Sequence, residues 1–334
     1  MVFRWLFSSS SSSNPPPPEP EDPPYDEHAL RPGDSTPAAV EDLSRPLQVP
    51  LSAIPPILIE EHPELKLSDY DLSRGQYARN VLALTHNAVR VEMSDMWSDI
   101  FPSLQKRCHS SAPLALSQQD LDDLHAWWSG FARFTLTSSL VDDMVTKKAF
   151  NDIYVGFDKE TKQIDALFHK VQEKNNVYLE LAFKKMATAV ENFEKDPSEN
   201  GCAQLLKAWR MLATMLGDIF AESERLIQAI DRWVRNPFEY KDLEKQATKI
   251  FTNKKRWGDD DSKRGEMIIM LCRWLNSEEL MREWMFRNLT KKELRYIDKW
   301  MNDYRVGRLV IIDRLYQKKA ATELGYHTEL EAIP

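Results

Sequence analysis

The sequence predicts an all-α protein: an up-down four-helix bundle with a helical C-terminal extension and a disordered N-terminal tail rich in proline and serine. Fourteen of the nineteen prolines fall within residues 1–63, and long stretches after them repeat apolar residues at helical spacing. No segment alternates apolar and polar residues as a half-buried strand does. We therefore expect three parts: the tail at 1–63, the bundle at 64–236 and the extension at 237–334.

The tail combines prolines, including Pro15–Pro18, with acidic residues and few large apolar side chains. Such a composition cannot bury enough apolar surface to offset the entropy of ordering, so we expect it to be disordered or extended. Its beginning, MVFRWLF followed by six serines, leaves two interpretations open: an unstructured end or an organelle-targeting segment.

Four long amphipathic helices are expected in the bundle, separated by prolines that end or kink a helix. Their approximate ranges are 75–101, 117–150, 158–193 and 199–235. Ser117 caps the second helix with Asp120 three residues later, and a bend is expected in the third at Asn175–Asn176. Four helices with one apolar face each bury those faces best as an antiparallel bundle.

The extension begins with a charged loop at Lys254–Gly265, followed by shorter helices over MIIMLCRWL and SEELMREWMF and a longer one capped by Thr290 and Glu293. So few residues would form a thin core of their own, so we expect the extension to pack on the bundle. Its apolar face could instead bind a protein partner, as could the proline-rich tail.

Composition excludes several classes of function. The net charge is −8, of which residues 1–60 carry −6, and no basic stripe suited to nucleic acid occurs. No apolar run approaches the roughly 18 residues of a membrane span. Cys108, Cys202 and Cys272 are odd in number and widely spaced, which predicts free thiols and a reducing, cytoplasmic compartment.

Each predicted bundle helix carries polar residues on its inward face. They are His86 on the first helix, Thr135, Ser138 and Asp142 on the second, Thr161 with Asp165 beside it on the third, and Ser223 between Glu222 and Glu224 on the fourth. Helix-bundle cores bind metals through inward histidines and carboxylates, so these positions are candidate ligands.

Residues 75–235 resemble the hemerythrin-like family. LALTHNAVRVEMSDMW is similar to that family's first helix, with its ligand histidine at His86, and AWWSGFARFTLTSSLVDDMVTKKAF is similar to its second helix. ETKQIDALF resembles the opening of its third helix. The resemblance implies a four-helix bundle in which histidines and carboxylates hold two bridged irons.

The ligand positions implied by the resemblance are mostly replaced. His86 is retained, whereas the second-helix histidine falls on Ser138 or Ser139, with the acid at Asp142 or Asp143, and the third-helix histidines fall on Thr161 and Asp165. The fourth helix contains no histidine. Hydroxyls are poor iron ligands beside imidazole, so the di-iron site is expected to be degenerate.

Two interpretations of these residues stay open. His86, Asp142, Asp165 and Glu222 (or Glu224) could hold a single cation, with iron the metal in question. Alternatively no cofactor is bound: Thr135, Ser138, Thr161 and Ser223 form a polar core pocket, and His86 or Arg90 pairs with the buried Asp142. We expect a non-catalytic binding, regulatory or structural module; the alternative is a metal-binding protein that senses oxygen, redox state or iron.

Overall fold

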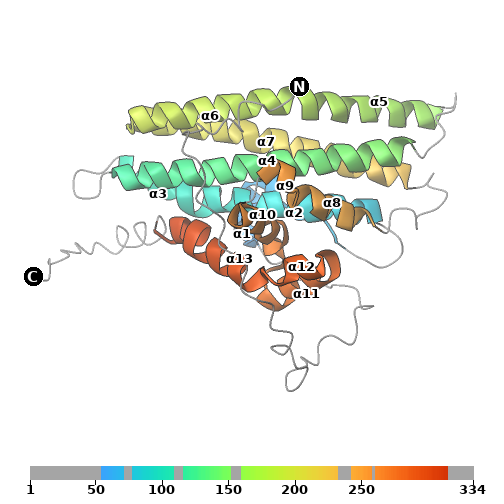
Figure 1. Cartoon of the computed structure of the whole chain (residues 1–334). Helices are drawn as coiled ribbons and strands as arrows, with labels where there is room; N and C mark the ends of the chain where they lie inside the picture. The colour runs from blue at the N-terminus through green and yellow to red at the C-terminus, as the bar shows by residue number, and fades with distance from the viewer. Residues whose placement is uncertain are drawn as a thin grey trace, which may run out of the picture. The chain divides into compact units, whose positions relative to one another are not determined.

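The computed structural model describes residues 54–70, 77–108, 116–151, 159–231, 242–257 and 260–314. All of them belong to one compact unit of the chain. Every regular element within these ranges is helical, which confirms the prediction of an all-α protein (Figure 1). None of the helices described is long and apolar enough to cross a membrane. The predictions for residues 1–53, including the proline run and the targeting segment, lie outside these ranges.

Four long helical stretches occupy the middle of the chain. They are α2 (Tyr77–Asp95) with the π-helical turn η3 (Met96–Ile100) and α3 (Phe101–Cys108); α4 (Gln118–Asn151); α5 (Lys159–Glu173) with the π-helical turn η4 (Lys174–Tyr178) and α6 (Leu179–Lys195); and α7 (Glu199–Ile230). The first stretch continues past Pro102, where an end was expected; the π-helical turn η3 ends two residues before this proline. The bend expected at Asn175–Asn176 coincides with η4.

Polar side chains fix the starts of two of these helices. Ser117 donates its backbone N–H to the carboxylate of Asp120 (2.8 Å) at the start of α4, as the spacing of these residues predicts. At the start of α7 the hydroxyl of Ser198 accepts the backbone N–H of Gly201 (3.2 Å). Each bond satisfies a backbone donor that has no partner within the helix.

The stretches pack around an aromatic core. α7 contacts α2, α4, α5 and α6, and α2 also contacts α4. Successive stretches run in alternate directions (Figure 1). Phe131 of α4 lies 5.3 Å from Trp209 of α7 and 6.5 Å from Phe183 of α6, measured between ring centroids. Burial of each such ring contributes roughly 1.5–3 kcal/mol.

The end of the predicted tail is ordered, so its expected boundary at residue 63 is wrong. Residues 54–63 include α1 (Pro56–Glu61), and the 3-10 turn η1 (Pro63–Leu65) follows. Prolines at the first position favour both starts because their φ is already helical. Ile54 and Leu65 are buried and anchor the segment. Residues 66–70, which we call the strap, continue from η1 without regular structure.

The extension contains more helix than the sequence indicates. Its elements are α8 (Leu243–Phe251), α9 (Lys254–Trp257), α10 (Asp261–Cys272), η6 (Arg273–Leu275), α11 (Glu278–Asn288), α12 (Lys291–Leu294), α13 (Ile297–Tyr304) and the π-helical turn η7 (Arg305–Leu309). The expected loop at 254–265 is therefore partly helical, because Asp260 caps α10 by accepting the N–H of Lys263 (3.1 Å). The capping box of Thr290 and Glu293 is confirmed.

Helix α2 is covered on all sides. Seventeen of its nineteen residues are buried, including Asn80, Asn87, Glu92 and Asp95. The helices α4, α7, α8 and α10 all contact it. The polar side chains of α2 must therefore find partners inside the protein, and these partners define the candidate sites.

Candidate functional site

The imidazole of His86 on α2 lies between two carboxylates. Its Nε2 atom is 2.9 Å from Oδ2 of Asp142 on α4, and its Nδ1 atom is 2.8 Å from Oε1 of Glu224 on α7. His86 and Asp142 are almost completely buried, and the ring stacks on Phe220 at 4.2 Å. Carboxylates only accept hydrogen bonds, so both bonds require the ring to carry two N–H groups, as the imidazolium cation does.

The pKa shifts agree with this charged form. Burial of the ring opposes protonation, but Asp142 and then Glu224 outweigh it and raise the pKa of His86 above its usual value. Burial also opposes ionisation of Glu224, but its bonds to His86 and the charge of Arg90 lower its pKa to about 2. Two cations, His86 and Arg90, thus face the carboxylates of Asp142 and Glu224.

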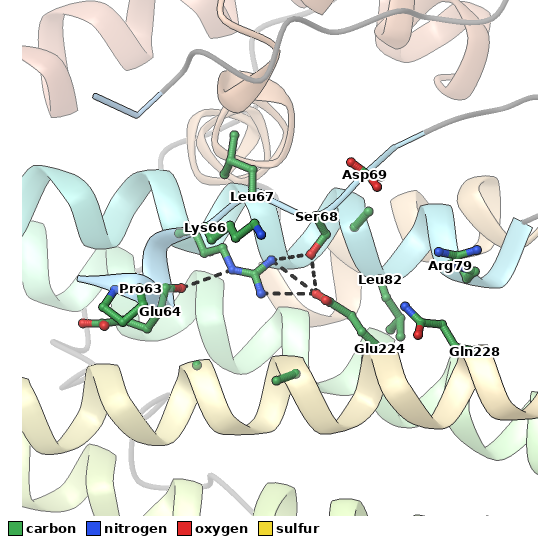
Figure 2. Close-up of a pocket in the computed structure, with 14 residues that line it drawn as sticks. Pro63, Glu64, Lys66, Leu67, Ser68, Asp69, Arg79, Leu82, Glu224 and Gln228 are labelled. Carbon is green, nitrogen blue, oxygen red and sulfur yellow. Dashed lines mark hydrogen bonds and ion pairs between the residues drawn. The ribbon is translucent and has the colours of Figure 1, made fainter. Parts of the chain in front are cut away.

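Arg90 connects this ion pair to the strap. Both of its terminal nitrogens lie 3.2 Å from Oε1 of Glu224, and one of them donates to the hydroxyl of Ser68 (2.6 Å). Ser68 donates in turn to the same Glu224 oxygen (2.5 Å), and Figure 2 shows these two side chains pointing toward each other. Arg90 also donates to the backbone oxygen of Glu64 (3.3 Å).

Asn87 holds the backbone of the strap. Its amide accepts the N–H of Ser68 (2.7 Å) and donates to the carbonyl oxygen of the same residue (2.8 Å). Gly217 of α7 permits the close approach of the preceding η1, because a Cβ atom there would lie 2.6 Å from the Cβ atom of Glu64. The strap is therefore fixed against both α2 and α7.

Asn175 reaches the level of Asp142 from η4. Gln172 donates to the hydroxyl of Thr146 (3.4 Å), and the two helices run in opposite directions (Figure 1). Asn175 follows Gln172 by about one turn, and Asp142 precedes Thr146 by about one turn, so both lie at one level. Asn175 is only 5% exposed, yet neither its amide nitrogen nor its amide oxygen has a partner among the described residues.

Ser223 completes the arrangement on α7. Lys174 and Glu222, the neighbours of Asn175 and Ser223, form an ion pair (3.0 Å), which brings these two residues to similar levels. The hydroxyl of Ser223 is fully buried and also lacks a partner within the described ranges. We call His86, Asp142, Asn175, Ser223 and Glu224 the polar layer.

Two of the four candidate metal ligands lie outside this layer. Asp165 is half-exposed and lies 3.4 Å from His169 on the same helix. Glu222 points to Lys170 and Lys174 instead of the core (2.7 and 3.0 Å). Of the four candidate ligands, only His86 and Asp142 contact each other. Glu224, the alternative to Glu222, is the second acid bonded to His86.

The four hydroxyls of the expected core pocket are all buried but lie at different levels. Ser138 and Thr135 precede Asp142 by one and two turns, and Ser138 donates back to the carbonyl of Phe134 (3.1 Å). Thr161 lies fourteen residues before Asn175, about 20 Å along the same helical stretch. Of these four residues, only Ser223 belongs to the polar layer. The other three were expected there because sequence periodicity identifies the inward face of a helix but not the level of a residue along its axis.

The donor set does not fit a bridged di-iron centre. The layer offers one histidine, and both of its ring nitrogens are engaged by carboxylates at opposite edges of the ring. In the ranges that the structure describes, no group of three or more His, Cys, Asp or Glu side chains is arranged to hold a metal ion. Asp142 and Glu224 therefore bond the imidazole separately and do not meet at a common point.

A pocket of about 450 Å³ opens beside the polar layer (Figure 2). It lies between the strap, α2 and α7, and the Ser68–Arg90–Glu224 group lines one side of it. Lys66 and Arg79 add positive charge, and Glu64 and Asp69 add negative charge. A mixed lining of this kind suits a small polar molecule better than an apolar one.

Sequence reasoning missed a second buried ion-pair cluster, which joins α2 to the extension. The carboxylate of Glu92, fully buried, accepts two bonds from Arg308 (2.6 and 2.9 Å), one from Arg273 (3.1 Å) and one from Tyr304 (3.1 Å). Arg273 also pairs with Asp95 (2.8 Å). The sequence of α2 gives no signal for this cluster, because the arginines that pair with Glu92 lie more than 170 positions further along the chain.

Comparisons with protein-family models, with curated proteins and with solved structures found no match to this chain.

Proposed function

We propose that this chain is a non-catalytic protein with a hemerythrin-like up-down four-helix bundle, in which an internal ion-pair network takes the place of the metal centre. Four helical stretches that alternate in direction and meet at α7 support this architecture. The position of His86 supports it too, because the residue that the resemblance assigns as a ligand lies in the bundle interior, opposite acids of α4 and α7.

One observation carries the proposal that the metal centre is replaced. Both ring nitrogens of His86 are hydrogen-bonded to carboxylates, so no lone pair of the imidazole is left for a metal. A ligating histidine binds metal through one neutral nitrogen and donates only the other N–H to a carboxylate. Here the protonated ring links α2, α4 and α7 by charge-assisted bonds.

The pocket next to the network supports a binding role. Ser68, Arg90 and Glu224 belong to both, so a molecule in the pocket would contact the groups that hold His86 and the strap. We propose that ligand binding there, or a protein partner on the extension, where Phe286 and Val306 are more than half exposed, is the basis of the protein's function.

A second candidate, cation binding by an oxygen-rich site, is favoured by Asn175 and Ser223. Their buried oxygens have no partner among the described residues and lie at the level of Asp142. Carboxylate, amide and hydroxyl oxygens are ligands for hard cations.

Metal analysis separates these proposals. Protein purified from iron-supplemented medium should contain far less than one iron per chain and lack an oxo-bridge absorption band, because His86 is protonated. Two irons per chain with such a band would overturn the replaced-centre proposal. A redox-inert cation retained through dialysis, and lost in both Asp142→Asn and Asn175→Leu but not in Glu222→Gln, would favour the second candidate. Glu222 is the matched control because it lies beside the layer but pairs with lysines.

A further inference from the structure

A pocket of about 300 Å³ lies between α4, α10 and the stretch from α13 to η7, and we call it the extension pocket. Four of its lining residues bring polar side chains to it: Ser129 and Arg133 of α4, Glu266 of α10 and Asp303 of α13. Its volume lies at the lower end of the range of ligand sites, so it suits a small molecule.

Two side chains of the Glu92 cluster form the floor of the extension pocket. Tyr304 and Arg308 line it and bond the buried carboxylate of Glu92 (3.1 and 2.6 Å). Arg308 also donates to the backbone oxygen of Trp127 (3.3 Å). Gly130 leaves room for this guanidinium, because a Cβ atom there would collide with it. The floor is therefore held in place by bonds that exist without a ligand.

The helical stretch 297–314 runs antiparallel to α4 along the pocket. Arg314 pairs with Asp123 (2.5 Å), whereas Arg308, six residues earlier, bonds to Trp127, four residues later on α4. These two contacts fix which residues of the two stretches share a level.

Two opposite charges lie at one end of the pocket. Arg133 follows Trp127 by six residues and Asp303 precedes Arg308 by five, so both lie about 7.5–9 Å beyond the bond between Arg308 and Trp127. Both side chains are partly exposed. Among the described residues, the terminal nitrogens of Arg133 and the carboxylate of Asp303 have no hydrogen-bond or ion-pair partner, and they do not pair with each other. The pocket separates them.

The opposite end of the pocket is apolar. Ala126 and Ile311 line it, and Ala126 precedes Arg133 by seven residues, about 10 Å along α4. Gly307 of η7 lies between the two ends, and no atom of the described residues lies within 4 Å of the position that its Cβ atom would take. The pocket thus offers opposite charges at one end and aliphatic groups at the other.

We propose that the extension pocket binds an α-amino acid with an aliphatic side chain. Its carboxylate accepts N–H groups of Arg133, whose planar guanidinium matches a carboxylate in geometry. Its ammonium group donates to Asp303 and Glu266, and its side chain lies at the apolar end. A simple anion would meet the two acids and a simple cation would meet Arg133, so a molecule that carries both charges fits best.

The inference does not rest on the proposed function, because no residue that lines the extension pocket belongs to the polar layer. A ligand in this position bridges α4 to α13. Binding should therefore stabilise the attachment of α13, as any ligand of the folded state does.

Isothermal titration calorimetry of the full chain with L-leucine tests the proposal, and we expect saturable binding. L-Leucinamide, which lacks the carboxylate, and 4-methylpentanoate, which lacks the ammonium group, should each bind about tenfold or more weakly, because each leaves a charged side chain unpaired. No binding of L-leucine, or equal binding of either analogue, would overturn the proposal. These comparisons use the native protein, so they do not depend on a variant that folds.

Two variants locate the site. Gly307→Leu should abolish binding because its side chain enters the space between the two ends, and Arg133→Met should weaken binding about tenfold or more. Lys147→Met is the matched control: it removes a cation of the same helix that pairs with Asp143 (2.7 Å) outside the pocket, so the affinity for L-leucine should not change. Wild-type affinity in Gly307→Leu or in Arg133→Met would place L-leucine elsewhere and contradict the inference.

Discussion

His86 shows how carboxylates can stabilise a buried, charged imidazole. Its ring is removed from water, which disfavours the cation, but two carboxylates at hydrogen-bond distance more than compensate. The pair with Asp142 could be predicted from the sequence, because both residues interrupt apolar stripes and a buried carboxylate needs a partner. The sequence could not predict that Glu224, and not Glu222, bonds His86. The two residues lie two positions apart on one helix and differ only in the direction in which they face.

Replacement of His86 by Ala should lower the free energy of unfolding by about 1–3 kcal/mol, because Asp142 is left buried without its main partner. Since folding raises the pKa of His86, its contribution is fully present below about pH 6.5, the unfolded value, and is lost as pH rises through the folded value. The difference between wild type and variant in urea titrations should therefore shrink as the pH rises above about 6.5 and through the folded value.

The control for this prediction is a double-mutant cycle with Asp142→Asn. If the two residues form one charged pair, the double variant should lose less stability than the sum of the single variants. Additive losses, or a difference that does not change with pH, would show that His86 is neutral in the folded protein.

Asn175 was predicted only as the site of a bend. The third-helix polar positions implied by the resemblance, Thr161 and Asp165, lie near the start of α5, far from the level of His86. Levels in a bundle depend on loop lengths and on contacts between helices, such as Gln172 with Thr146, and neither is visible in the periodicity of one segment.

At the scale of the elements, α10 and α13 approach each other through a glycine. A Cβ atom on Gly265 would lie 2.3 Å from two atoms of the Trp300 ring, which is buried and cannot move aside. The long helices between residues 77 and 230 were predictable from long periodic stretches, whereas α9 and the start of α10 were not. Their residues are mostly charged, and tertiary contacts, not an apolar stripe, hold them in helical form.

Gly265→Ala should destabilise the protein by about 1–3 kcal/mol, because the added methyl group forces α13 away from α10. Gly307→Ala is the matched control: nothing lies within 4 Å of its Cβ position. Since alanine favours helix over glycine by up to about 1 kcal/mol, that variant should be neutral or more stable. Thermal unfolding of both proteins checks this prediction, and similar losses in the two variants would contradict it.

At the scale of the whole molecule, α2 is the central helix and the extension completes its burial. In a bundle of four helices alone, one face of each helix would contact water. The sequence of α2, which contains polar residues, is therefore typical of an ordinary amphipathic helix. The carboxylate of Glu92 on α2 instead accepts bonds from Arg273 and Arg308, which lie more than 170 positions further along the chain. Such pairs have no local signature, which explains why the Glu92 cluster could not be predicted.

Glu92→Gln should cost about 3–5 kcal/mol, because the change leaves the guanidinium of Arg308 buried without its carboxylate. Glu266→Gln removes the other carboxylate near the same arginine (3.5 Å), but that pair is partly exposed and should cost less than about 1 kcal/mol. Hydrogen exchange should show faster opening of α13 in Glu92→Gln alone. Unchanged protection of α13 would mean that the extension is held by its apolar contacts.

The π-helical turn η4 has a consequence for the direction in which α6 faces. Val171, Asn175 and Leu179 are spaced by four residues, and all three side chains are buried. In regular α-helix each step of four overshoots a full rotation by 40°, so two steps would turn Leu179 by 80° away from Val171. The wider turn absorbs this surplus angle. If this segment were regular α-helix, every side chain from Leu179 onward would be turned about the helix axis by about a quarter of a rotation. Phe183 would then leave the aromatic core.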